Sequence, residues 1–169
     1  MAAVARASHP ALYERGWHPT AVCGVLGSAT AASRLLDLSE GRVAAAVRIA
    51  LLRAGGLRAA FGSDGKSLQV GMAAATGVTA ARLAATGSSV PPEHVHAPAG
   101  FEEVYGGKWA VPDASRPEVA ENWIKAYPCC LKAPSSIEAT DRAGARGRCC
   151  SRRPSRCTRV APRCPLRLR

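Results

Sequence analysis

A run of small residues between positions 69 and 86 constrains the fold most. The segment, QVGMAAATGVTAARLAAT, consists mainly of Gly, Ala, Thr and Val. It predicts a helix whose small side chains allow a second helix to approach closely. Apolar residues make up 47% of the chain but aromatic residues only 5%, which favours closely packed helices over a β-sandwich. The predicted fold class is therefore mainly α.

Two further helices are predicted before this run. Apolar and small residues recur at helical spacing within residues 25–38. A second stripe lies within residues 40–54, where Ser39 can cap the helix and Gly55–Gly56 ends it. Residues 1–15 carry few structural signals.

The rest of the ordered sequence is shorter and more varied. We expect a helical turn at 101–105, strand-like character at 119–130, and a helix at 135–143 capped by Ser135 and Glu138. The predicted organisation has four parts, which are a helical domain, a linker, the start of a second domain and a tail, at residues 1–107, 108–118, 119–143 and 144–169.

The positive charge of the chain is concentrated at its end. The net charge is +11, yet residues 1–140 hold 13 basic and 11 acidic residues, whereas residues 141–169 hold ten arginines and one acid. We expect residues 144–169 to be disordered, because no helical or alternating pattern is present there. Such an Arg-, Pro- and Cys-rich composition is also typical of a GC-rich gene read out of frame. The alternative is a genuine basic tail.

Neither a secretory signal nor a membrane span is apparent. The first 19 residues lack a long apolar run, and no stretch of 18 uncharged apolar residues occurs. We therefore expect a cytoplasmic protein without a membrane partner. Its seven cysteines are then reduced thiols and not a disulfide framework.

Lys66 is the first candidate for a functional residue. Residues 60–67, AFGSDGKS, nearly match the phosphate-binding loop G-x-x-x-x-G-K-[ST], but Ala60 replaces the first glycine and a helical segment precedes the loop. We therefore reject nucleotide binding. A lysine in a loop just before a helix N-terminus still favours an anion such as a carboxylate. A solvated loop lysine is the plainer interpretation.

His18 is the second candidate. Pro19 restricts it to extended geometry, which can direct the imidazole outward from a loop, and its pKa range suits proton transfer. A surface or capping histidine is the alternative. His94 and His96 lack further ligands at metal-binding spacing, so we expect no metal site.

The cysteine pair at 129–130 has a simple interpretation as well. We expect Cys129 and Cys130 to be two buried small residues after a strand, in preference to a nucleophile or ligand pair. The cysteines of the tail have no accompanying histidine and no C-x-x-C spacing, so a zinc site is not expected there.

Three segments together resemble the MmgE/PrpD family, which includes 2-methylcitrate dehydratase and cis-aconitate decarboxylase. They are GWHPTAVCGVLGSATAASRLLDLS, FGSDGKSLQVGMAAATGVTAARLAATG and IKAYPCCLKAPSSIEA, and they follow one another in the family's order. The resemblance implies a large all-helical domain and a smaller α/β lid domain in a homodimer, with the active site between the domains. It implies neither a metal nor an organic cofactor. The chain would then hold a partial helical domain, the beginning of the lid and the disordered tail.

The resemblance also assigns site residues. His18, Lys66 and Lys125 fall on active-site positions of the family, where the two lysines would bind substrate and all three would serve catalysis. We expect them to converge on one anion pocket. Pro134 and Gly65 stand where the family has histidine and threonine. The family's early Asp-rich helices and most of its lid have no counterpart, so we expect an internal fragment that is inactive alone.

These observations predict a lyase, of the dehydratase or decarboxylase type, acting on a small polycarboxylic acid such as 2-methylcitrate or cis-aconitate. The alternative is a non-catalytic protein whose basic tail binds nucleic acid or an anionic membrane. Because the tail lacks interleaved aromatic residues and any folded motif, nucleic acid is the weaker candidate partner.

Overall fold

The computed structural model describes residues 1–111, 113, 115, 117–121, 124–130 and 133–145. Contacts divide the chain into two units, residues 1–122 and 123–169. The first unit is built from helices, and the described residues contain no strand beyond one isolated bridge between Trp17 and Leu57. The predicted mainly α class is confirmed. No helix of the described ranges combines the length and apolarity needed to cross a bilayer.

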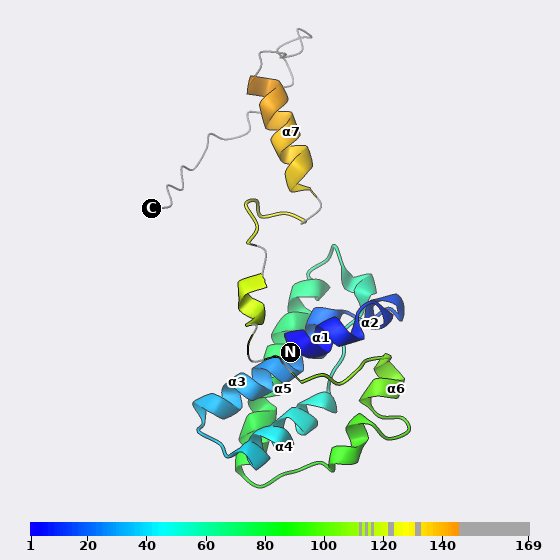
Figure 1. The fold of residues 1–169 in the computed structure, drawn as a ribbon, viewed down its shortest axis with the longest axis vertical. Helices are drawn as coiled ribbons and strands as arrows, with labels where there is room; N and C mark the ends of the chain where they lie inside the picture. The colour runs from blue at the N-terminus through cyan, green and yellow to red at the C-terminus, as the bar shows by residue number, and fades with distance from the viewer. Residues whose placement is uncertain (112, 114, 116, 122–123, 131–132, 146–169) are drawn as a thin grey trace. The chain divides into compact units, whose positions relative to one another are not determined.

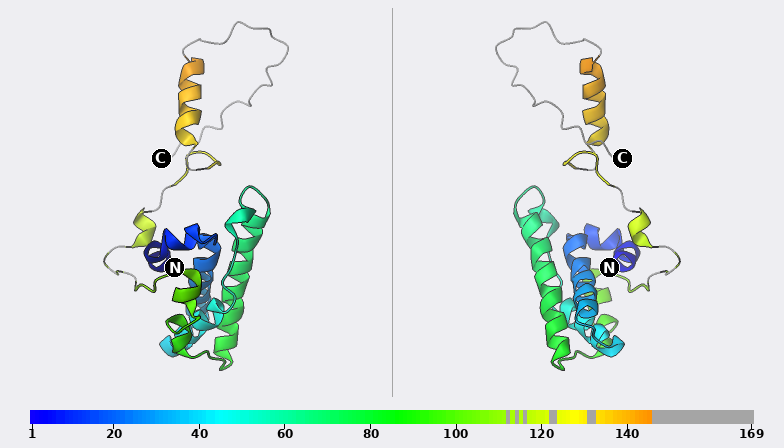
Figure 2. Two further views of the ribbon diagram at one scale, coloured as in Figure 1. Left: turned by 90° about the vertical axis from the view of Figure 1, so that its right-hand side faces the viewer. Right: turned by 90° about the vertical axis from the view of Figure 1, so that its left-hand side faces the viewer.

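Three helices form the centre of the first unit (Figures 1 and 2). They are α3 (Pro19–Leu35), α4 (Glu40–Leu51) and α5 (Gly65–Ala85), and each contacts the other two. Their buried positions are mostly alanine, valine and leucine. The three predicted helices are therefore confirmed, although α3 begins six residues earlier than predicted, because Pro19 occupies the first helical position, where a missing N–H costs nothing. Ser39 precedes α4 as predicted, but its side chain makes no capping hydrogen bond.

The crossing of α3 and α5 explains the small residues of the 69–86 run. A Cβ on Gly77 would lie 2.6 Å from the carbonyl carbon of Ser28 and closer still to the backbone nitrogen of Ala29. The Ser28 hydroxyl donates a hydrogen bond to the carbonyl oxygen of Ala73, at 3.0 Å. The predicted close approach of a second helix is thus confirmed, with α3 as that helix.

The first fifteen residues are more ordered than their sequence indicates. They form α1 (Ala2–Ser8) and α2 (Ala11–Glu14), with Val4 and Leu12 buried. Helices this short are not stable alone, so their order comes from tertiary packing, including the contact of α1 with α3.

Short elements link α4 to α5 and follow α5. They are η1 (Arg58–Ala60), η2 (Pro92–Val95) and α6 (Phe101–Tyr105), the last being the predicted helical turn. The Tyr105 ring lies 4.7 Å from the Trp17 ring, and its hydroxyl donates a hydrogen bond to the carbonyl oxygen of Ala54, at 2.6 Å. Gly106 ends α6 in the left-handed conformation.

The strand predicted at 119–130 is wrong for the described residues. The 3-10 helix η3 (Glu118–Glu121) occupies its start, and residues 124–130 form no strand. A single strand needs a hydrogen-bonded neighbour, and the described residues supply none. In the second unit, α7 (Pro134–Ala145) confirms the helix predicted at 135–143. Ser135 lies inside its first turn, however, and not at the capping position. The predicted tail lies outside the described residues from residue 146 onward.

Candidate functional site

His18 lies at the start of α3 and is almost completely buried. Its backbone is extended, as the following proline requires, and its N–H donates a hydrogen bond to the carbonyl oxygen of Gly56, at 2.9 Å. Only 2% of the residue is exposed, so the prediction of an outward-directed imidazole is wrong. Nδ1 is buried and finds no hydrogen-bond partner in the described part of the chain. A buried polar atom without a hydrogen-bond partner costs about 1–3 kcal/mol of stability.

Lys66 belongs to the first turn of α5 and not to a loop before it. The helix begins at Gly65, four residues earlier than predicted. Ser63 stabilises this early start, because its hydroxyl donates to the carbonyl oxygen of Ala60 at 2.7 Å and accepts from the N–H of Gly65 at 3.2 Å. The turn therefore fixes the direction in which the Lys66 side chain leaves the helix.

The ring of Phe61 connects His18 with Lys66. The imidazole and phenyl centroids lie 4.8 Å apart, with their planes nearly perpendicular at 79°. The Lys66 ammonium lies 4.9 Å from the phenyl centroid, which is within the range of a cation–π contact. Two of the three predicted site residues, distant in sequence, therefore share one aromatic neighbour.

A second cation lies beside this group. The Arg58 guanidinium carbon is 4.5 Å from the centroid of the Tyr13 ring, and Nη1 donates a hydrogen bond to the Tyr13 carbonyl oxygen at 3.0 Å. The Tyr13 and Phe61 rings are neighbours, with centroids 6.5 Å apart. We call Tyr13, Arg58, Phe61 and Lys66 the cation–aromatic cluster.

The electrostatics of this region favour an anion and a neutral imidazole. Within the described residues, neither Arg58 nor Lys66 forms an ion pair with a carboxylate. Burial, and then the positive charge of Lys66, lower the pKa of His18 below 6.5. His18 is consequently neutral near pH 7 and able to accept a proton.

Lys125 belongs to the second unit, where it is exposed and lies outside any helix. Its predicted convergence with His18 and Lys66 stays a prediction. Of the neighbouring cysteines, Cys129 is half-buried and Cys130 exposed, so the prediction of two buried residues after a strand is wrong. No group of three potential metal ligands occurs in the described ranges.

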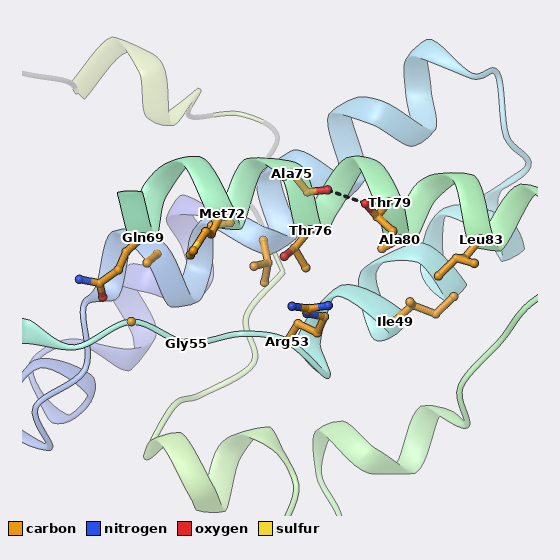
Figure 3. Close-up of a pocket in the computed structure, with 14 residues that line it drawn as sticks. Ile49, Arg53, Gly55, Gln69, Met72, Ala75, Thr76, Thr79, Ala80 and Leu83 are labelled. Atoms are coloured by element: carbon orange, nitrogen blue, oxygen red, sulfur yellow. Dashed lines mark hydrogen bonds between the residues drawn. The ribbon is translucent and has the colours of Figure 1, made fainter. Parts of the chain in front are cut away.

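A cavity of about 420 Å³ lies beside α5 and is bounded also by α3 and α4 (Figure 3). Figure 3 shows Gln69 near Gly55 at one end, Arg53 opposite Thr76, and Ile49 near Leu83. His18, Lys66 and Lys125 do not line it.

Gln69 is a polar residue lining this cavity, and the sequence alone did not indicate it. Its Nε2 donates to the carbonyl oxygen of Leu57 at 3.3 Å, while Oε1 is buried with no partner in the described part of the chain. Gly56 both lines the cavity and accepts the His18 hydrogen bond, so this end of the cavity adjoins His18. The spacing of Gln69 three residues after Lys66, on one side of α5, is the signal that sequence reasoning overlooked.

Comparison with known proteins gives two matches. Residues 1–112 match the model of the MmgE/PrpD N-terminal domain. Over 89 residues, or 53% of its length, the chain is 39% identical to cis-aconitate decarboxylase of Homo sapiens. That alignment covers 18% of the human protein, so the chain aligns with less than a fifth of this relative.

Proposed function

The chain belongs to the MmgE/PrpD family, and we propose that it carries part of the active site of a lyase that acts on a small polycarboxylic acid. The proposed reaction is of the dehydratase or decarboxylase type, with cis-aconitate and 2-methylcitrate as candidate substrates. The observation that carries the proposal is that His18 and Lys66 contact the same ring, that of Phe61. The buried imidazole centroid lies 4.8 Å from the phenyl centroid, and the ammonium lies 4.9 Å from it.

In this proposal Lys66 binds a substrate carboxylate. Its ammonium forms no ion pair in the described part of the chain, so its charge is free to interact with an anion. A fixed cation stabilises a carboxylate most when negative charge increases beside it during the reaction. Lys125 is proposed as a further cation of the same site, on the family resemblance alone.

His18 is proposed to transfer the proton. In a dehydration, a neutral imidazole removes a proton from the carbon next to a carboxylate, the electron pair forms a C=C bond, and the C–O bond breaks while an acid protonates the departing hydroxyl, which leaves as water. In a decarboxylation, the C–C bond to one carboxylate breaks, CO2 leaves, and an acid protonates the remaining carbon. The lowered pKa of His18 suits the first role directly, because the neutral form predominates near pH 7.

Calorimetric titration of the chain with tricarballylate, a saturated tricarboxylate, tests the binding half of the proposal. Wild-type protein is expected to bind, and Lys66→Ala to weaken binding by about 1.5–3 kcal/mol, the value typical of a charge-assisted hydrogen bond. Arg82→Ala, at the other end of α5, is the matched control and is expected to leave affinity unchanged. Absence of binding by the wild type contradicts the proposal.

Turnover of cis-aconitate and 2-methylcitrate tests the chemical half. Where the chain turns over either acid, His18→Gln is expected to lower kcat more than it raises KM. The reason is that a proton-transferring group stabilises the transition state and contributes little to substrate binding. Equal kinetics of wild type and His18→Gln contradict the role given to this residue. A homodimer, proposed from the family resemblance, is tested in the same preparation by sedimentation velocity.

A further inference from the structure

The cation–aromatic cluster contains a second cation that the family resemblance does not assign. We propose that the Tyr13 and Phe61 rings hold Arg58 and Lys66 as two separate carboxylate-binding groups, and that Arg58 sets the preference for a substrate with at least two carboxylates. This inference rests on the proposed function, since it specifies the ligand class of the same site.

Each cation has its own ring. The Arg58 guanidinium carbon lies 4.5 Å from the Tyr13 centroid, and the Lys66 ammonium lies 4.9 Å from the Phe61 centroid. Because the two centroids are 6.5 Å apart, the rings stand side by side and each supports one charge. Two cations on neighbouring rings offer charge to more than one carboxylate, which exceeds what a monocarboxylate needs.

The backbone fixes both supports before any ligand arrives. Arg58 begins η1 and its N–H donates to the carbonyl oxygen of Gly16 at 2.9 Å, while its Nη1 donates to the Tyr13 carbonyl oxygen at 3.0 Å. A guanidinium carries five N–H donors, so several stay available after this bond. Phe61 follows η1 as its C-cap residue, and Gly62, at a φ of +87°, turns the chain toward α5.

The exposure of the cluster separates it from the hydrophobic core. Phe61 is 39% exposed, whereas Phe101, a core phenylalanine of the same unit, is 4% exposed. A ring that served only to fill the core would be buried like Phe101. Phe61 instead contacts an ammonium, an imidazole and the Tyr13 ring, and the Arg58 and Lys66 charges lie without carboxylate partners in the described ranges.

A comparison of two ligands by calorimetry tests the inference on the complete chain. Wild-type protein is expected to bind tricarballylate at least tenfold more tightly than propionate, a monocarboxylate. Arg58→Gln is expected to lose about tenfold in tricarballylate affinity, the lower end for a charge-assisted hydrogen bond, and to leave propionate affinity unchanged. Lys66→Ala is expected to weaken both ligands.

Two further variants keep the test independent of folding. Arg53→Gln removes an arginine of the cavity wall that lies outside the cluster, and it is expected to bind like wild type. Arg58→Lys retains the charge but loses the planar group over Tyr13, and it is expected to fall between wild type and Arg58→Gln. Circular dichroism verifies that each variant keeps the wild-type helix content.

The outcomes distinguish this inference from the proposed function. Tricarballylate binding that Lys66→Ala weakens and Arg58→Gln does not would retain the lyase site and overturn the role of Arg58. Equal wild-type affinity for tricarballylate and propionate would overturn it too. No binding of either ligand by the wild type would contradict the proposed function itself.

Discussion

Substitution of Gly77 by alanine tests the central packing contact of the fold. The new Cβ would lie 2.6 Å from the Ser28 carbonyl carbon and closer still to the Ser28 hydroxyl and the Ala29 nitrogen. The hydroxyl can rotate away, but only by losing its hydrogen bond to the Ala73 carbonyl oxygen. The two backbone atoms can move only if α3 and α5 separate.

The magnitude follows from three terms. Overpacking a tight contact costs about 1–3 kcal/mol, and the lost Ser28 hydrogen bond costs about 1 kcal/mol more. Alanine in place of glycine inside a helix stabilises the folded chain by roughly 0.5–1 kcal/mol, which offsets part of this cost. Gly77→Ala should therefore lower the free energy of unfolding by about 1–3.5 kcal/mol overall.

Gly71→Ala provides the matched control, because it lies in the same helix and its Cβ would meet no atom within 4 Å. It should raise the free energy of unfolding by about 0.5–1 kcal/mol, through helix propensity alone. Urea denaturation followed by circular dichroism at 222 nm measures both variants. Equal effects of the two substitutions would refute the close crossing at Gly77.

Three other predictions concern buried polar groups. The stability of the wild type should rise with pH just below pH 6.5, because burial and Lys66 lower the pKa of His18 in the folded protein and the unfolded chain then binds more protons. Urea midpoints on either side of pH 6.5 should show this rise, and His18→Gln should reduce it; an unchanged slope would count against the buried imidazole. Burial raises the pKa of the Cys23 thiol to about 11, so alkylation near pH 8, followed by peptide mass spectrometry, should modify exposed Cys130 well before Cys23. Similar rates would contradict this packing. Tyr105→Phe should lower the free energy of unfolding by about 0.5–1.5 kcal/mol, since the Ala54 carbonyl loses its donor, and a urea midpoint equal to wild type would exclude that bond.

The helical core was predictable because its signals are local. Periodic apolar positions mark α3 and α4, and the small residues around Gly77 indicate a close helix crossing. The order of residues 1–15 was not predictable, because it depends on burying Val4 and Leu12 against distant parts of the chain. Tertiary packing decided those elements, and sequence periodicity does not report it.

The residues of the candidate site were likewise predictable only in part. Residue type and neighbouring Pro or Gly singled out His18 and Lys66, and the family resemblance supported both. The burial of His18, however, results from contacts made through the fold, including its bond to Gly56. Phe61 and Arg58 were missed because an exposed ring and an arginine have no distinctive spacing. Only the folded chain brings Phe61 beside Lys66 and Arg58 beside Tyr13.

If His18 and Lys66 belong to one polycarboxylate site, cis-aconitate must perturb the His18 imidazole, and an NMR titration with this acid measures that response. The imidazole resonance of His18 is assigned by its absence in His18→Gln and followed as the ligand is added. We predict a saturable shift in the wild type, with an apparent Kd at least about tenfold weaker in Lys66→Ala. An unshifted His18 resonance, or the same Kd in both proteins, would show that His18 and Lys66 do not share a polycarboxylate site.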